Sequence, residues 1–348
     1  MSAFKPRIIR GLPTQLRLST GLLSFNIAWT FMAGEVSGNV SQVDRAWSIL
    51  PTLYTALYTF FPLFESVPVN LKAQGVQPRA LVMTALQILW SIRLSYNTNR
   101  RGLFSLKEED YRWAVFRAKV PTWLMSLFNF AFIAVFQNLL LFMLGLPAYS
   151  PSVNPAPLHS GDALISSLIL LAIGGEFVAD NQQWAYHNFK KTGTLDSKRE
   201  WIGARLQFTP ADKERGFLAK GLWAYSRHPN CAFEQLVWLL MTLFPFLTTP
   251  DLATNPVDII AVLSPSILLS LLFLASTAFT EKISASKYSA YAAYQQRVGM
   301  FWPADTLRKW FWLRIVRGKP MLEQAERSIW GTPSQARKET SKETHKDE

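Results

Sequence analysis

The stretch Gly221-Leu222-Trp223-Ala224-Tyr225-Ser226-Arg227-His228-Pro229-Asn230-Cys231-Ala232-Phe233-Glu234 leads directly into an apolar run over residues 235–249. Two cations, an amide and a carboxylate therefore stand at the mouth of a predicted membrane helix. Because such groups are costly to desolvate against lipid, they usually serve a ligand or a structural ion pair. The stretch thus predicts both a helix boundary and a candidate site.

The composition indicates a membrane protein. Of 348 residues, 49% are hydrophobic and 14% aromatic, with 13 Trp, which is more apolar bulk than one soluble core needs. The single Cys excludes an intramolecular disulfide and any CxxC site, and the four scattered His form no HExxH, so we expect no protein-bound metal. The net charge of +12 comes without a nucleic-acid motif, so we expect no nucleic-acid binding.

Several apolar runs approach the roughly 17–25 residues that a membrane-spanning helix needs. They cover residues 18–34, 47–64, 80–96, 122–146, 162–179, 235–249 and 258–280. We therefore predict an all-α, polytopic transmembrane helix bundle of about seven spans, or six if the first run only lies in the interface. Polar residues inside the runs, among them Asn129, Gln137 and Asn138, predict a polar-lined pocket, because lipid alone cannot satisfy them.

Basic residues indicate the topology. Lys and Arg gather in residues 100–119, in 190–227 and after 282, whereas 148–161 and 250–257 contain none. The positive-inside rule then places the basic loops and the C-terminus in the cytosol, together with the opening stretch. We predict a basic N-terminal segment at 1–17, a transmembrane domain at 18–303, and a basic interfacial segment with a disordered tail at 304–348.

The opening stretch is the first candidate site. No GxGxxG, GxxxxGK[ST], GxSxG or DFG-type motif is present, so a phosphate-bearing cofactor must be held by side chains at the cytosolic mouth of the bundle. Arg suits phosphate because its planar guanidinium can donate two parallel hydrogen bonds to phosphate oxygens. If a helix restarts after Pro229, Asn230 and Glu234 lie one turn apart and can contact a nicotinamide carboxamide or a ribose. Alternatively, Asn230 caps the helix and Glu234 offsets a nearby Arg.

Two further clusters carry candidate residues. Glu176 and Asp180 lie at i and i+4 near the end of a predicted span, where two like charges destabilise the helix unless a ligand or the following Arg-rich loop bridges them. Tyr96 ends another apolar run just before Arg100 and Arg101. It can act as a proton donor to a carbonyl or alkene, or it can be an interfacial belt residue beside arginines that set the topology.

Together these residues resemble the steroid 5-alpha-reductase superfamily, and within it the uncharacterised membrane proteins related to the reductase C-terminal domain, a DUF1295-like group. The resemblance covers most of the chain in order and spacing. Its motifs are residues 43–51 (Val-Asp-Arg-Ala-Trp-Ser-Ile-Leu-Pro), Arg93-Leu94-Ser95-Tyr96-Asn97 with Arg100-Arg101-Gly102, Glu109-Asp110-Tyr111-Arg112-Trp113, Ala179-Asp180-Asn181-Gln182, Ser226-Arg227-His228-Pro229-Asn230 with Glu234, and the closing segment 291–303.

The resemblance implies a bundle that opens to the cytosol, NADPH held by the C-terminal half, and hydride delivery to an activated carbon–carbon double bond. Tyr96 is the implied proton donor, with Asn97 as the alternative one position away. At 231–233 the chain has Cys-Ala-Phe where the family has Tyr-Phe-Gly, so a ring replaces a glycine and we expect an altered cofactor fit. The implied cofactor-binding residues are Glu176, Asp180, Arg227, His228, Asn230 and Glu234.

The resulting hypothesis is a membrane-embedded NADPH-dependent reductase of a conjugated C=C in a sterol, isoprenoid or other lipid enone or enal. One alternative is an S-adenosylmethionine-dependent membrane methyltransferase of the isoprenylcysteine type, which also uses an Arg-His-Pro segment. The other is a non-catalytic lipid-binding protein derived from a reductase, which the altered residues 231–233 favour. We expect a lipid or sterol-like partner and an endoplasmic reticulum location with a cytosolic C-terminus.

Overall fold

The computed structural model describes residues 12–65, 67–195 and 200–331. All regular elements in these ranges are helical and none is a strand, which confirms the all-α prediction. Parts of the predicted segments 1–17 and 304–348, including most of the predicted disordered tail, lie outside the described residues. The chain forms two compact units, which are unit 1 (Met1–Ile173 with Val237–Leu271) and unit 2 (Gly174–Leu236 with Leu272–Glu348).

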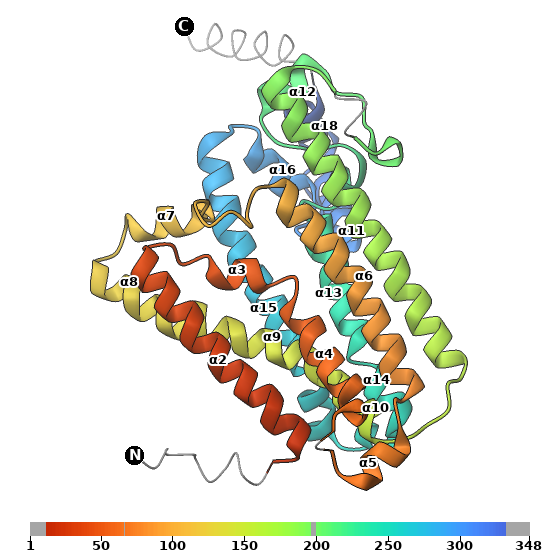
Figure 1. The fold of residues 1–348 in the computed structure, drawn as a ribbon. Helices are drawn as coiled ribbons and strands as arrows, with labels where there is room; N and C mark the ends of the chain where they lie inside the picture. The colour runs from red at the N-terminus through yellow and green to blue at the C-terminus, as the bar shows by residue number, and fades with distance from the viewer. Residues whose placement is uncertain (1–11, 66, 196–199, 332–348) are drawn as a thin grey trace, which may run out of the picture. The chain divides into compact units, whose positions relative to one another are not determined.

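Unit 1 holds most of the helices (Figure 1). Three long helices, α11 (Ser160–Thr192), α13 (Pro229–Met241) and α15 (Pro256–Lys287), contribute one part to each unit. The elements within unit 1 are α2 (Thr14–Ser37), α3 (Gln42–Ala46), α4 (Leu50–Phe60), η1 (Phe61–Leu63), α5 (Val69–Gln74), α6 (Pro78–Arg100), α7 (Tyr111–Arg117), α8 (Thr122–Phe128), η2 (Asn129–Gln137), α9 (Asn138–Gly145), η3 (Leu146–Ala148), α10 (Tyr149–Val153), α14 (Phe244–Thr248) and η6 (Pro250–Ala253).

Four helical stretches among the described residues are long and apolar enough to cross a membrane, namely Thr122–Val153, Ser160–Thr192, Pro229–Thr248 and Pro256–Lys287. They contain four of the predicted runs. The runs at 18–34 and 80–96 form the long helices α2 and α6, whose polar residues, such as Asn26 and Gln87, lower their mean hydropathy, whereas the run at 47–64 contains α4, which is only 11 residues long. The total of about seven spans therefore stays a prediction.

Close helix packing fixes the middle of unit 1, where α4 packs against both α6 and α9 (Figure 1). The approach of α9 to α4 requires Gly145, because a Cβ there would lie 2.6 Å from the Tyr54 Cβ. Such a distance is well inside van der Waals contact. A larger residue at 145 would therefore push the two helices apart.

A buried ion pair ties the first turn of α6 to the start of α11 within unit 1. The Arg79 guanidinium donates to both Asp162 carboxylate oxygens, at 2.6 and 2.9 Å. It also donates to the Pro157 carbonyl at 2.8 Å and to the Thr248 hydroxyl at 3.1 Å. A buried ion pair is tolerated when its remaining donors and acceptors are also hydrogen-bonded. Here the remaining donors of Arg79 bond two further segments, so that the pair joins four segments of unit 1.

The motif at Asp44 and Arg45 connects α3 to the 105–117 segment. The Arg45 guanidinium donates to the carbonyls of Ser105 and Glu108, and the Trp113 indole N–H donates to Asp44 at 2.9 Å. Burial raises the pKa of the Asp44 carboxyl, and the hydrogen bond from Trp113 opposes that rise. These motif residues therefore have a structural role in unit 1.

Unit 2 is built around the C-terminal part of the chain. Its core contains Phe217, Tyr291, Tyr294 and Ile329, and the Tyr294 hydroxyl donates to the Trp223 carbonyl. The elements within unit 2 are η4 (Ile202–Ala204), α12 (Pro210–Arg215), η5 (Gly221–Ala224), α16 (Tyr291–Arg297), α17 (Pro303–Phe311), η7 (Trp312–Val316) and α18 (Lys319–Trp330).

Candidate cofactor site

Two sequence motifs meet in unit 2 through a pair of polar side chains. Asp180 lies on α11, and Asn230 lies in the first turn of α13, which begins at Pro229 as predicted. The Asn230 amide nitrogen donates to an Asp180 carboxylate oxygen at 3.3 Å. The side-chain amide oxygen of Asn230, Oδ1, is buried and accepts no hydrogen bond within the described residues. This side chain therefore retains one acceptor for a ligand donor.

Glu176 and Glu234 extend the same two helix faces. Each lies four residues from a member of the contacting pair, and residues at this spacing share a face of an α-helix. Glu176 is completely buried, and Glu234 and Asp180 are also buried. The predicted carboxylates therefore lie in the middle of α11 and at the start of α13, and the Asp180–Asn230 contact joins the side chains of the two helices.

The unusual Phe233 is accommodated by a glycine on α11. A Cβ at Gly175 would lie 2.6–2.8 Å from three atoms of the Phe233 ring. The ring therefore covers the helix backbone beside Glu176. The expectation that Phe233 alters the cofactor fit stays a prediction, and the packing at Gly175 explains how unit 2 tolerates the ring.

Arg227 is held by a carboxylate that the sequence analysis did not single out. Its guanidinium donates to both carboxylate oxygens of Glu281, at 2.7 and 2.9 Å, and its third nitrogen donates to the carbonyls of Gln295 and Val298. The Arg227 and Glu281 side chains are only 4% and 3% exposed. Each guanidinium nitrogen is therefore engaged by protein, and a direct contact with phosphate would require breaking these bonds.

Glu281 is the centre of this network. His228 Nε2 lies 2.8 Å from one of its oxygens, and the Gln295 amide donates to the other at 2.8 Å. The backbone N–H groups of Arg227 and His228 donate to the carbonyls of residues 299 and 300, at 2.9 and 3.0 Å. The only sequence signal for Glu281 is its position as a carboxylate just after the last apolar run.

A second cation joins Arg227 at the C-terminal end of α16. The Lys309 ammonium donates to the Gln295 carbonyl at 2.8 Å and to the Val298 carbonyl at 3.2 Å, which are the two acceptors that Arg227 uses. The end of a helix carries partial negative charge, which favours cations. Burial lowers the pKa of the Lys309 ammonium, and the neighbouring Arg227 lowers it further.

Tyr96, the predicted proton donor, belongs to unit 1 and not to the unit of the other predicted site residues. Tyr96 lies on α6 and is half exposed. The Arg100 guanidinium carbon lies 5.1 Å from the centre of its ring, and Arg100 also donates to the Asn97 side chain at 3.0 Å. The role of Tyr96, and that of Asn97 as its alternative, stays a prediction.

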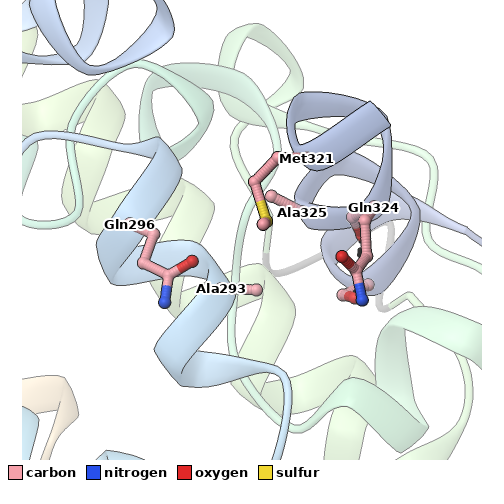
Figure 2. A pocket seen from close by; sticks show the side chains of 6 residues that line it. Ala293, Gln296, Met321, Gln324 and Ala325 are labelled. Atoms are coloured by element: carbon pink, nitrogen blue, oxygen red, sulfur yellow. Dashed lines mark hydrogen bonds between the residues drawn. The ribbon is translucent and has the colours of Figure 1, made fainter. Parts of the chain in front are cut away.

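A hollow of about 220 Å³ lies between α16 and α18 (Figure 2). Its polar groups are neutral, and none of the predicted site residues lines it. It is therefore separate from the Asp180–Asn230 contact. The residues that line it are Ala293, Gln296, Met321, Gln324, Ala325 and Ser328.

The fold and the site together define the class of this protein. It is an all-helical membrane protein with a buried polar cluster on α11 and α13. The chain belongs to the family described as "Protein of unknown function (DUF1295)", whose model matches residues 30–298. This range contains the predicted site residues and Glu281. An uncharacterized protein of Schizosaccharomyces pombe is 35% identical over 287 residues, covering 81% of this chain and 78% of the relative. No solved structure matches the chain significantly.

Proposed function

We propose that this chain is a membrane-embedded NADPH-dependent reductase that adds hydride to a conjugated C=C of a sterol, isoprenoid or other lipid enone or enal. The observation that carries the proposal is the contact between Asp180 and Asn230, which lie 50 residues apart in the sequence. The contact leaves a buried acceptor on Asn230 at the site where the resemblance to steroid reductases implies a nicotinamide cofactor.

The residues on α11 and α13 fit the nicotinamide-riboside end of such a cofactor. The Asn230 carbonyl oxygen can accept a hydrogen bond from the carboxamide N–H of the nicotinamide. The carboxylates of Glu176, Asp180 and Glu234 can accept hydrogen bonds from ribose hydroxyls. When bound, the cofactor supplies the hydride, and the role of these residues is to bind and orient it.

The residues proposed for the phosphate groups of the cofactor fit their role less directly. In the observed geometry Arg227 is a positioning residue, because Glu281 and two carbonyls hold its guanidinium. Its backbone N–H and that of His228 fix the turn that precedes Pro229, and hence the start of α13 and the place of Asn230. We retain His228, which is more exposed than Arg227, as the proposed phosphate contact of this pair.

The remaining assignments belong to the same proposal. Tyr96 is the proposed proton donor to the substrate, since it carries a hydroxyl and the residue is half exposed. The candidate membrane helices support a lipid as the substrate. We also propose an endoplasmic reticulum location, as the family resemblance implies, with the C-terminus in the cytosol, as the distribution of basic loops favours.

The Glu281 network favours a second candidate, a non-catalytic lipid-binding protein. If the purpose of Arg227 and His228 is only to pair with Glu281, the segment needs no cofactor. The Arg-His-Pro segment also keeps the S-adenosylmethionine-dependent methyltransferase as an alternative. The three candidates differ in the small molecule that the protein binds, and a titration therefore separates them.

The test is a titration of purified full-length protein in lipid nanodiscs with NADPH, NADH and S-adenosylmethionine. We expect saturable binding of NADPH that Asn230→Leu weakens by roughly 10- to 100-fold, because a buried hydrogen bond is lost. His187→Gln, an exposed change on α11, the helix that carries Asp180, is the control and should bind as the wild type does. Binding of S-adenosylmethionine alone would overturn the proposal, and binding of none of the three would favour the non-catalytic candidate.

A further inference from the structure

The α17–η7 segment carries a row of large apolar side chains on its outer face. Leu307, Phe311 and Ile315 recur every four residues, and Trp312 and Val316 stand beside them. All five are more than half exposed, and Ile315 reaches 73%. Scattered apolar residues are normal on protein surfaces, but a continuous row of this kind marks an interaction surface.

The opposite face fixes which side of the segment points outward. Leu313 is buried against Leu322 and Ala325 of α18, with Trp310 packed beside them. The Thr306 hydroxyl accepts the Gly299 N–H at 2.7 Å and donates to the Tyr225 carbonyl at 2.6 Å. The segment is therefore held in place by unit 2, and its apolar row is not a core face that the structure has left unpacked.

Cations surround the apolar row. Residues 302–321 contain five Lys and Arg but only one acidic residue, Asp305. Arg308, Arg314, Arg317 and Lys319 are exposed. Aromatic and aliphatic side chains flanked by Arg and Lys match a surface that is apolar below and anionic above, which is the boundary of a membrane that contains anionic lipid.

We propose that the outer face of α17 and η7 docks on the surface of an anionic lipid leaflet, with Phe311, Trp312 and Ile315 in the acyl boundary. Arg314, Arg317 and Lys319 then face the headgroups. The same chain carries candidate membrane-spanning helices, which favours a lipid surface as the occupant. The hollow between α16 and α18 contributes no charge to this recognition, because its polar lining residues are neutral (Figure 2).

The segment is also bonded to the turn that holds the candidate cofactor site. Lys309, on the inner side of α17, shares its two carbonyl acceptors with Arg227. Thr306 bonds the residues that flank the same network. The docked helix therefore shares backbone acceptors with Arg227 through its inner face. The docking itself does not depend on the proposed reductase activity.

The test uses full-length protein in which the single cysteine is removed by Cys231→Ser and a fluorophore is attached at Ile315→Cys. The protein is placed in nanodiscs of phosphatidylcholine, with or without phosphatidylserine, that contain a spin-labelled quencher lipid. A fluorophore at Gln324→Cys, a neutral exposed position on α18, is the control. We expect strong quenching at 315 that increases with phosphatidylserine, and little quenching at 324.

A charge variant tests the lipid preference. Because each Lys or Arg near an anionic surface is worth roughly a five-fold change in partitioning, the triple variant Arg314→Gln, Arg317→Gln, Lys319→Gln should lose the phosphatidylserine-dependent part of the quenching. Its thermal unfolding should match the parent, since these side chains are exposed. Absence of quenching at 315 in both lipid mixtures, or quenching that is the same with and without phosphatidylserine, would overturn the proposal.

Discussion

The ring of Phe233 on α13 covers Gly175 on α11 so closely that a side chain at position 175 would require the ring to shift. A Cβ there would lie 2.6 Å from the ring Cζ. The adjacent Gly174 has open space around its Cβ position. Two neighbouring glycines of one helix therefore differ in their tolerance of a methyl group, and the difference comes from one ring.

Gly175→Ala should destabilise the protein by about 1–3 kcal/mol, the usual cost of overpacking a tight contact. Gly174→Ala should be neutral or slightly stabilising, because Ala is the better helix former. Thermal unfolding of the purified variants in detergent measures both changes. In a protein that already carries Phe233→Ala, the Gly175→Ala change should cost less stability than it does in the wild type, because the ring that the methyl group would meet is absent. Equal behaviour of the two glycine variants would contradict the contact.

Glu281→Gln should lower stability by roughly 3–5 kcal/mol, because it leaves the Arg227 guanidinium buried without its counter-charge. The double variant Arg227→Met, Glu281→Leu should be less harmful than Glu281→Gln alone, since no charge then remains buried. A double-mutant cycle built from Arg227→Met, Glu281→Leu and the double variant, measured by chemical denaturation, gives the coupling between the two residues. If the single and double variants lose stability additively, the ion pair is not the reason for the loss.

Gln87→Met should leave the thermal midpoint unchanged or raise it. Gln87 on α6 is completely buried, and neither atom of its amide has a hydrogen-bond partner within the described residues. Replacing a desolvated amide with an apolar side chain of similar size removes an unfavourable group.

The matched control for Gln87 is Gln182→Met on α11. The Gln182 carbonyl oxygen accepts the Leu222 N–H at 3.0 Å, so its loss should cost about 1–3 kcal/mol. Differential scanning fluorimetry of both variants is the measurement. A large loss in Gln87→Met would show that the amide binds a partner that this structure does not contain.

Stability should fall as the pH is lowered below the ordinary pKa of an aspartate, because of Asp212 in α12. Burial alone would raise the pKa of this carboxyl, but hydrogen bonds from Lys220, Thr209 and Arg215 lower it below its usual value. An acid whose pKa is lower in the folded state stabilises the protein above its unfolded-state pKa, and this stabilisation is lost as the pH falls through the folded-state pKa.

Asp212→Asn removes this titration and leaves Arg215 and Lys220 with a neutral partner. The variant should be less stable at neutral pH and should depend less on pH in the acid range. Unfolding midpoints across that range, compared with those of Asp305→Asn at a more exposed ion pair, measure the difference. An unchanged acid dependence in Asp212→Asn would assign the effect to another group.

Much of the candidate site could be predicted from local spacing. The break at Pro229 and the four-residue intervals from Glu176 to Asp180 and from Asn230 to Glu234 give the right helix faces, because helical periodicity is a local property. Glu281 could not be predicted in the same way. Its partners Arg227 and His228 lie more than 50 residues away in the sequence, and no local pattern encodes such a pairing.

The sequence by itself determined the helical class, the four strongly apolar helices and the start of α13, since these depend on composition, periodicity and proline. Only the tertiary structure decided that Arg227 pairs with Glu281, that Asp180 meets Asn230, and that Phe233 rests on Gly175. These are contacts between distant segments, and they depend on how the helices pack. Charge pattern alone cannot tell whether a buried arginine awaits a ligand or already has a carboxylate.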